Sequence, residues 1–581
     1  MLAARTEPQV RRRIEELERA FGDPCDSANP LGQAALAEAD RRNELPAAGE
    51  RALDAADFGS EFVPVALGGR LDRADVLARV LRPVFRRDVA LGFGYGITSL
   101  FAASAVWAAG TEQQRDRTAR ILLGGGRLSI VHHNLAHGNA MWQGELVARR
   151  TGNGYVLNGR KDAVLNAERS AAYVVYARTD AGRGPRSHSV LLLDARERPP
   201  AGLRVLPRQL TTGMRGCRFA GLELADCHLP ADSVVGRPGD GTELALRTFQ
   251  LNRALVSSVV LGAGDTALRS AVAAVTAEGA KGAGKRQRQV LAGVFADLLW
   301  CDAMATVVLR SLHVLPDSAH LGAAAVKYLV PDLVREDLEE LGTVLGASDS
   351  HRESGLSYVH KLLRDLPAAG LGHLGTAACQ AVLLPQLPWL ARNSWGVAEE
   401  PPPSLFRAGP SMPPLEMGRL VVAGGTDFLA ASLNGALPRL GGDAGEAEPY
   451  RGVLVRLTEA LITELGLLRQ KFGAMSASDR AVLARPEVCA LADRYAHVAA
   501  AGAVLGFWTR QNGTDPFLAD PAWPALALSR LGGRLGLKLP ALPPDCVDRV
   551  FGEVVARYRS GRAYDLHAGL LAGSGGIGRG R

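Results

Sequence analysis

The feature that most constrains the fold of this chain is a block of β-rich sequence set between two long helical regions. From residue 126 to about 240, short apolar runs such as 172–176 and 189–193 alternate with turns rich in Gly and Asn. The dipeptide Asn153-Gly154 predicts a type I′ hairpin, because both central positions of that turn need a positive φ. The block therefore predicts an antiparallel β-domain inserted into a mainly α protein, not a doubly wound α/β chain.

Helical periodicity defines the region before this block, residues 1–125. An amphipathic helix is expected near the N-terminus, where apolar side chains step by four, three and four from Val10 to Phe21. Residues 92–109 are almost wholly apolar, as in a buried helix. Thr111 and Gln114 have the spacing of a capping box, which predicts that another helix begins there. These patterns indicate an N-terminal helical domain.

Helices return after residue 240. Apolar residues that step by four and three between 294 and 312 predict the seam of a helical bundle over residues 241–397, and Pro331 predicts a kink or a break in the next helix. Residues 398–414 contain six prolines and are expected to form an extended linker. A second helical unit over 415–560 and a flexible Gly- and Arg-rich tail over 561–581 complete the predicted organisation.

Composition narrows the functional class. The 581 residues carry a formal net charge of +7, and the densest basic runs lie beside acidic residues in helical segments, so no nucleic-acid partner is expected. The seven cysteines are scattered without a CxxC pair, which argues for a reducing compartment. No secretion signal and no uninterrupted apolar stretch of about 18 residues is visible, so the sequence predicts a cytoplasmic protein without a membrane span.

Two motif-like patterns are assigned no function. Gly573-x-Gly575-x-x-Gly578 has the form of a dinucleotide fingerprint, but that motif must open a helix, and no helix is predicted after it. His133 and His137 have a spacing that suits a metal on a helix. Their surroundings predict a strand and a loop without a third ligand, so no metal site is expected.

Several passages, taken in order, resemble the acyl-CoA dehydrogenase family. Residues 110–114 are similar to the family's GTEEQK passage, 154–161 to its GY.LNG.K hairpin, and 213–241 to its GxRxS/T…VP…G.G passage. Residues 364–365 and 375–376 resemble its RD…EGT passage, so the match spans about residues 50 to 395. The resemblance implies a helical N-domain, a β-barrel and a C-terminal four-helix bundle, followed here by an extra helical domain. Length and the extra helices look closer to the longer members, including actinobacterial ones in natural-product pathways.

The resemblance also implies FAD-dependent oxidation of an acyl thioester carried by CoA or by an acyl carrier protein. In the family a carboxylate removes the α-proton while the β-hydride passes to the flavin. The two places where members carry that carboxylate hold Leu374 and Asn252 here, and neither side chain is a carboxylate. His373 is the nearby titratable substitute, and a structural histidine is the alternative interpretation.

The family's flavin contacts map onto altered residues. The loop that contacts the isoalloxazine corresponds to Val131, His133, Gly138 and Asn139, and the family's stacking Trp and its Thr correspond to Ala163 and Leu165. Gln289 fits the Gln that follows an Arg reaching the cofactor from a neighbouring subunit, whereas that Arg has no clear equivalent in 278–285. Thr376 belongs to the EGT-like passage. FAD is therefore either bound in a changed site or lost.

Three functions remain open at this stage. One is a flavoenzyme with non-standard catalytic residues, including a flavin- and oxygen-dependent epoxidase or decarboxylase in secondary metabolism. Another is an FAD-deficient, inactive partner subunit of a heteromeric dehydrogenase, since polar flavin contacts have become apolar. The third is a scaffold or binding protein. The first two imply a homodimer, a homotetramer or a heteromer with a related dehydrogenase, because family members complete the cofactor site across subunits.

Overall fold

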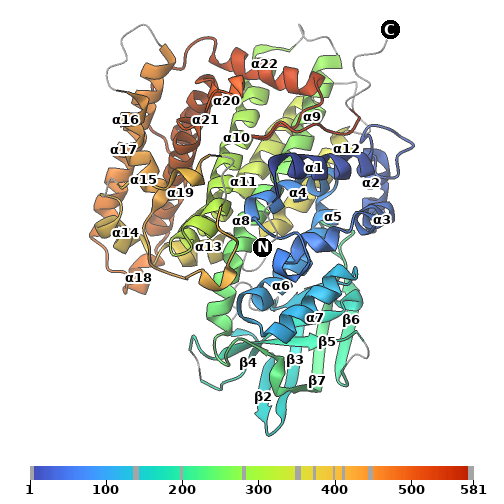
Figure 1. Cartoon of the computed structure of the whole chain (residues 1–581). Helices are drawn as coiled ribbons and strands as arrows, with labels where there is room; N and C mark the ends of the chain where they lie inside the picture. The colour runs from blue at the N-terminus through green and yellow to red at the C-terminus, as the bar shows by residue number, and fades with distance from the viewer. Residues whose placement is uncertain are drawn as a thin grey trace.

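A computed structural model describes residues 5–134, 143–182, 184–196, 200–277, 283–346, 355–370, 375–396, 399–407, 412–441 and 449–573. The predicted order of helices, sheet and helices is confirmed (Figure 1). The sheet projects from one end of a helical body, and the N-terminal and C-terminal helices lie on opposite sides of the central helices (Figure 1).

The N-terminal region consists of helices that pack around a common apolar core. In α1, Val10, Leu17 and Phe21 are each 1% exposed, as their spacing predicts. The capping box also forms, since the Gln114 N–H donates to Thr111 Oγ1 over 3.2 Å and the Thr111 N–H donates to Gln114 Oε1 over 3.0 Å. The helices are α1 (Glu7–Phe21), α2 (Gln33–Arg41), α3 (Ala47–Ala55), α4 (Ala74–Arg87), α5 (Val89–Leu91), the π-helical η3 (Gly92–Ile97), α6 (Thr98–Ala109) and α7 (Glu112–Leu123).

The β-domain is one eight-stranded sheet with the strand order β6-β7-β3-β2-β4-β5-β8. It is mainly antiparallel, but β1 lies off this path and pairs with β4 in parallel. A parallel pair needs a long connection, which the segment carrying β2 and β3 supplies. The strands are β1 (Leu128–Val131), β2 (Val147–Thr151), β3 (Gly154–Leu165), β4 (Ala172–Arg178), β5 (His188–Asp194), β6 (Leu203–Gln209), β7 (Phe219–Pro230) and β8 (Val234–Val235).

The predicted hairpin forms between β2 and β3, but its turn differs from the prediction. Thr151 pairs with Gly154, so the two loop residues are Gly152 and Asn153, and neither has a positive φ. The type I′ prediction was therefore wrong. Gly154 instead starts β3 with φ 157°, where a Cβ would meet the Leu229 carbonyl oxygen at 2.1 Å. Close approach to β7, rather than turn geometry, explains this glycine.

The central helices form the bundle. The predicted seam of α10 is buried, with no member more than 2% exposed: Val294, Leu298, Cys301, Ala305, Val308 and Leu312. Pro331 does not divide its helix, because α11 continues through it. The helices are α8 (Gly241–Val259), α9 (Leu261–Ala277), α10 (Lys285–Val314), α11 (Ala319–Gly346), α12 (Gly355–Asp365), the 3-10 helix η9 (Leu366–Gly370), α13 (Thr376–Leu383) and α14 (Leu387–Asn393).

Four helical segments are long and apolar enough, by length and composition, to cross a membrane. They are Val89–Ala109, Gly241–Thr276, Lys285–Val314 and Pro486–Trp508. Between 72% and 100% of their most apolar windows is buried inside the protein. Their apolar surface is therefore used in internal packing.

The proline-rich segment packs against the bundle along its described part. Leu405 and Phe406 are fully buried, and the Arg310 guanidinium donates to the Leu405 carbonyl over 3.3 Å. His313 bonds to the Pro413 carbonyl over 2.8 Å. The segment therefore differs from the solvated, extended linker that its prolines suggest, because its Leu-Phe pair contributes apolar surface to the core.

An extra helical unit follows. Its long helix α19 packs against α15 and against α10 and α11 of the bundle. The helices are α15 (Phe428–Asn434), α16 (Ala436–Leu440), α17 (Pro449–Gly473), α18 (Arg480–Leu483), α19 (Pro486–Trp508), α20 (Pro516–Ala519), α21 (Ala522–Arg534) and α22 (Cys546–Arg559).

The segment after α22 differs from the predicted flexible tail as far as residue 573. Tyr564 is 1% exposed, and its N–H donates to Asp265 over 3.1 Å. The Leu566 N–H donates to Asp302 over 2.9 Å, and the Asp565 carboxylate lies 3.6 Å from the Arg82 guanidinium. Buried partners on α4, α9 and α10 thus hold this segment. Gly575 and Gly578 lie outside the described residues.

A buried carboxyl pair joins the extra unit to the bundle. Asp297 on α10 accepts hydrogen bonds from Arg530 on α21 over 2.8 and 2.5 Å. Asp337 on α11 is 1% exposed, and its pKa is raised well above the usual range, first by burial and then by the charge of Asp297. Asp337 is therefore the carboxyl of the pair that keeps its proton to the higher pH.

Asp337→Asn is expected to raise the melting temperature near pH 7. The pKa of Asp337 is higher in the folded protein than in the unfolded chain. The wild type is therefore most stable at a pH below the ordinary carboxyl pKa, and its stability falls as the pH rises. Asn cannot ionise, so the difference in melting temperature between variant and wild type should grow with pH and vanish toward about pH 4. Thermal unfolding monitored by circular dichroism across this range measures it.

Asp297→Asn is the matched control, and should destabilise the protein by about 3–5 kcal/mol because Arg530 loses its buried carboxylate. A melting temperature of Asp337→Asn below that of the wild type at every pH would contradict the assignment of the proton.

Candidate functional site

The residues predicted to contact a flavin gather in part where β1 ends. Ser129 Oγ on β1 donates to the Leu165 carbonyl on β3 over 2.5 Å. Lys161 Nζ, also on β3, donates to the His132 carbonyl over 3.2 Å. These bonds bring Val131 and His133 beside the strand that carries Ala163 and Leu165. Gly138, Asn139, His373 and Leu374 lie outside the described residues.

Helix α8 closes this site with an aromatic cluster. The His132 ring lies 3.6 Å from the His133 ring, 5.8 Å from Phe249 on α8 and 6.1 Å from Tyr176 on β4, measured between ring centroids. Asn252, at a predicted carboxylate position, follows Phe249 on α8 by three residues and so lies one helical turn further along. The end of β1 and the middle of α8 thus form one site.

Burial sets the electrostatics of this site. It lowers the pKa of Lys161 to about 8, and burial together with the Lys161 charge lowers the pKa of His133 to about 4. At neutral pH His133 is therefore uncharged and a weak base, while most Lys161 side chains carry a proton. A buried ammonium beside a neutral imidazole favours a ligand with electron-rich oxygen or nitrogen atoms.

Two amide side chains at the site have buried atoms that lack hydrogen-bond partners within the described structure. Asn252 is fully buried, and neither its Oδ1 nor its Nδ2 is bonded. Asn134 donates to the Arg160 carbonyl over 3.3 Å, but its Oδ1 is unpaired. An unpaired buried polar group costs about 1–3 kcal/mol, so amides of this kind indicate that a ligand or water satisfies them.

Further along, a second polar layer surrounds α8. Arg253 on α8 and Lys327 on α11 are 2% and 3% exposed, and both lie within electrostatic reach of the Cys379 thiol on α13. Lys327 Nζ donates to the Ala369 carbonyl of η9 over 2.7 Å. Burial lowers the pKa of Lys327 to about 8. The buried residues of this layer are basic or neutral. The carboxylate whose charge acts on Lys327 and Cys379 is that of Asp332, which is exposed and accepts the Thr376 hydroxyl.

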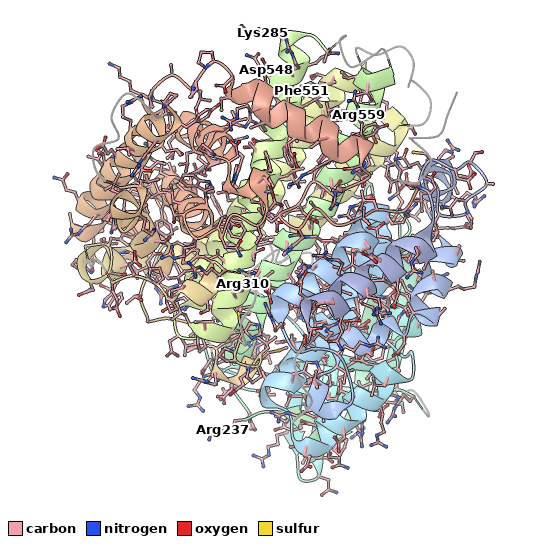
Figure 2. The ribbon with its side chains drawn as sticks, turned by 45° about the horizontal axis from the view of Figure 1, so that its top comes forward. Arg237, Lys285, Arg310, Asp548, Phe551 and Arg559 are labelled. Carbon is pink, nitrogen blue, oxygen red and sulfur yellow. The ribbon has the colours of Figure 1, made fainter. Side chains whose placement is uncertain are left out.

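Two predicted cofactor residues stand apart from the site. Thr376 is exposed at the start of α13, and its hydroxyl donates to Asp332 over 3.4 Å. Gln289 is exposed in the first turns of α10, beside Arg288, which forms a 3.0 Å ion pair with Asp548 of α22. Figure 2 shows Lys285 and Asp548 at the end of the molecule opposite Arg237. Within one chain, Gln289 does not reach the end of β1.

Sequence reasoning missed Phe249, Tyr176 and the buried state of Lys161 as features of this site. Phe249 and Tyr176 carry no chemical signal in the sequence, because aromatic residues in helices and strands are usually core. Lys161 does carry a chemical signal, because a lone lysine in a strand with buried apolar neighbours needs a polar partner.

Comparisons with known proteins agree with the fold. Residues 137–227 match the family model described as acyl-CoA dehydrogenase, middle domain. The human mitochondrial short-chain specific acyl-CoA dehydrogenase is 27% identical over 263 residues, 45% of this chain and 63% of that protein. The probable acyl-CoA dehydrogenase FadE25 of Mycobacterium tuberculosis is 24% identical over 237 residues, 41% of this chain and 60% of that protein.

The chain belongs to the acyl-CoA dehydrogenase superfamily.

Solved structures define how far this superfamily member shares the fold. A Bacillus anthracis acyl-CoA dehydrogenase complexed with FAD aligns over 96% of both chains with a TM-score of 0.69 at 13% identity. The prolyl acyl carrier protein oxidase AnaB aligns over 98% of its own chain but 65% of this one, with a TM-score of 0.57 at 19% identity. The first structure therefore matches nearly the whole of this chain, and the second matches about two thirds of it. In sequence, the match covers less than two thirds of the curated relatives' length.

Lys161→Met is expected to raise the pKa of His133 above about 4, because one of its two causes, the adjacent positive charge, is removed while burial remains. Nuclear magnetic resonance titration of histidine ring signals measures the change. Arg149→Met, which alters an exposed charge on β2, should leave the His133 pKa where it is. An unchanged His133 pKa in Lys161→Met would show that the Lys161 charge does not act on this ring.

Proposed function

We propose that this superfamily member is an FAD-dependent oxidoreductase that acts on an acyl thioester through a site whose usual carboxylate is replaced by an amide. The observation that carries the proposal is Asn252: it is fully buried, and its amide has no bonded partner within the described structure. It stands where the family resemblance implies a base. A buried amide kept without a partner is costly unless a ligand pairs with it.

The residues present fit a flavin ring. The free amide atoms of Asn134 and Asn252 offer donors and acceptors suited to the ring's carbonyl and N–H groups, and Lys161 offers a positive charge next to β1. Phe249 and Tyr176 supply an apolar wall that excludes water from that side. When bound, FAD would supply the two-electron acceptor that the side chains lack.

Proton chemistry limits the reaction class. Asn252 does not ionise, and His133, with a pKa near 4, is a weak base at neutral pH. Simple α-proton abstraction therefore has no strong base among the buried residues described at this site. A flavin- and oxygen-dependent epoxidation or decarboxylation in secondary metabolism needs no such carboxylate. It therefore agrees better with these residues than α-proton abstraction does. For dehydrogenation, the base would be His373.

A second candidate, the FAD-deficient partner subunit, is favoured by one observation. Ala163 and Leu165 place apolar side chains on β3 where the family resemblance implies a stacking Trp and a bonding Thr. Loss of those groups weakens flavin binding, and the fold would then serve a heteromer with a related dehydrogenase.

We further propose a cytoplasmic location and an oligomeric state. All seven cysteines are free, which agrees with a reducing compartment. The distance of Gln289 from β1 within one chain agrees with a cofactor site completed by a second subunit, as a homodimer, homotetramer or heteromer.

Purified protein is expected to be yellow, and added FAD is expected to raise its melting temperature. A ligand present at about 100 times its dissociation constant adds about 2.7 kcal/mol to the free energy of unfolding. Absorption spectra and thermal shift measure both effects. Asn134→Leu combined with Asn252→Leu should reduce the FAD-induced shift, whereas Asn158→Ala, a partly exposed residue on β3, should not. Colourless protein with no FAD-induced shift would support the partner-subunit function instead.

Asn252→Glu should introduce dehydrogenation of straight-chain acyl-CoA thioesters, because it restores a carboxylate where the resemblance implies the base. Mass spectrometry of the product, with an artificial electron acceptor present, detects the loss of two hydrogens. Gln250→Glu, a buried change two residues earlier on α8, is the matched control and should give no product. FAD-bound Asn252→Glu protein that forms no enoyl product would remove position 252 from the reacting centre.

A further inference from the structure

A buried cationic layer borders the candidate site along α8. Arg253 on α8 is 2% exposed, and Lys327 on α11 is 3% exposed. Helix α11 packs against both α8 and α13, and α13 carries the third member, Cys379 (Figure 1). Cys379 is fully buried and lies within electrostatic reach of both cations. We call Arg253, Lys327 and Cys379 the cationic layer.

Helical spacing places the cationic layer next to the site. Arg253 follows Asn252 directly and Phe249 by four residues, so Arg253 and Phe249 are neighbours on one face of α8. Four residues of α-helix span roughly 6 Å. The Phe249 ring belongs to the aromatic cluster at the end of β1. A ligand group that extends one helical turn beyond this cluster therefore reaches the cationic layer.

The positive charge of the layer exceeds the negative charge near it. The groups whose charge acts on Lys327 are Arg253, Cys379 and Asp332. The Cys379 thiol is uncharged at neutral pH, because burial raises its pKa. Asp332 is exposed and accepts the Thr376 hydroxyl, so water screens its charge. Among the described residues, the buried part of the layer therefore has an excess of positive charge.

This excess charge is costly without an anion. Two cations withdrawn from water lose their hydration, and their mutual repulsion adds to that cost. Lys327 Nζ donates to the Ala369 carbonyl over 2.7 Å, which uses one of its three N–H groups. The amide of Asn252, next to Arg253 in sequence, has no bonded partner within the described structure. A carboxylate at this place would offset the repulsion and accept the remaining hydrogen bonds of Lys327.

We propose that Arg253 and Lys327 bind a carboxylate on the acyl group of the thioester substrate. This inference rests on the proposed function and names the class of acyl group that the site takes. The layer lies one helical turn from the site, so a group carried by the reacting ligand itself can reach it. A carboxylate has a single charge and costs less to desolvate than a phosphate, which favours it at side chains as buried as these.

Isothermal titration calorimetry with two unreactive CoA thioethers of equal length tests the proposal. One probe ends in a carboxylate, and the other ends in a carboxamide, which has the same shape without the charge. Neither probe has a thioester carbonyl, so binding is measured without turnover. The wild type should bind the carboxylate probe at least about tenfold more tightly than the carboxamide probe. Equal affinities for the two probes would overturn the proposal, and this comparison needs no variant.

Variants assign the preference to the layer. Lys327→Met removes one charge at nearly constant length and should lose most of the preference while keeping the carboxamide affinity. Lys327→Arg keeps the charge and should keep the preference. Lys471→Met, which removes an exposed charge on α17, is the matched control and should bind both probes like the wild type.

Folded Lys327→Met protein with the full wild-type preference would overturn the proposal. Where Lys327→Met does not fold, Lys327→Gln takes its place, because the glutamine amide keeps an N–H donor for the Ala369 carbonyl.

Inorganic phosphate distinguishes an acyl carboxylate site from a general anion site. Loss of the preference between the two probes when phosphate is added would make the layer a general anion site and overturn the proposal. An equal loss of affinity for both probes would place the phosphate at the CoA portion that they share, and would support the proposal.

Failure of the proposed function is read separately, from the flavin spectrum and the FAD-induced thermal shift. A carboxylate preference in a colourless protein without such a shift would keep the carboxylate site and remove the oxidoreductase. A yellow protein with equal affinity for both probes would keep the oxidoreductase and overturn the carboxylate site.

Discussion

A buried ion triad holds the three parts of this protein that border the site. Lys361 on α12 lies 2.8 Å from Asp88, which caps α5, and 2.6 Å from Asp365 at the end of α12. Asp365 also accepts the N–H of Met214, in the loop between β6 and β7, over 2.5 Å. Burial and the neighbouring Asp88 charge raise the pKa of Asp365, and the two carboxylates raise that of Lys361. The side chains of Asp88, Lys361 and Asp365 are at most 3% exposed, so bulk water cannot satisfy their charges. The N-terminal helices, the bundle and the β-domain must therefore meet in one arrangement that pairs these charges.

The same loop shows how little freedom this junction has. A Cβ on Gly213 would meet the Arg364 carbonyl oxygen at 1.6 Å, so only glycine lets the β-domain approach α12 this closely. That approach fixes the β-domain against the helices, and the fixed position brings the end of β1 to the middle of α8. The chemistry of the site therefore depends on a contact that is made elsewhere.

Helix α8 relates the site to the surface around it. Its first residue follows the exposed segment of Arg237, its middle carries Phe249 and Asn252, and Arg253 turns toward Cys379 and Lys327. A single helix thus carries both Asn252 at the candidate site and Arg253 in the buried cationic layer. The buried side chains that it organises are basic or neutral, which favours electron-rich ligands and makes proton abstraction difficult.

The sequence by itself determined the order of the elements, the buried faces of α1 and α10, the capping box at Thr111, and the family, because these depend on local periodicity and on motifs that keep their spacing. Through the family resemblance it also predicted that Asn252 stands in place of a carboxylate. Tertiary structure alone decided the rest. The parallel pairing of β1 with β4, the packed course of residues 405–406 and 563–566, and the meeting of His132 with Phe249 all join segments distant in the chain. No local pattern encodes such pairs, since their free energy comes from burial and from hydrogen bonds that exist only once both segments are in place.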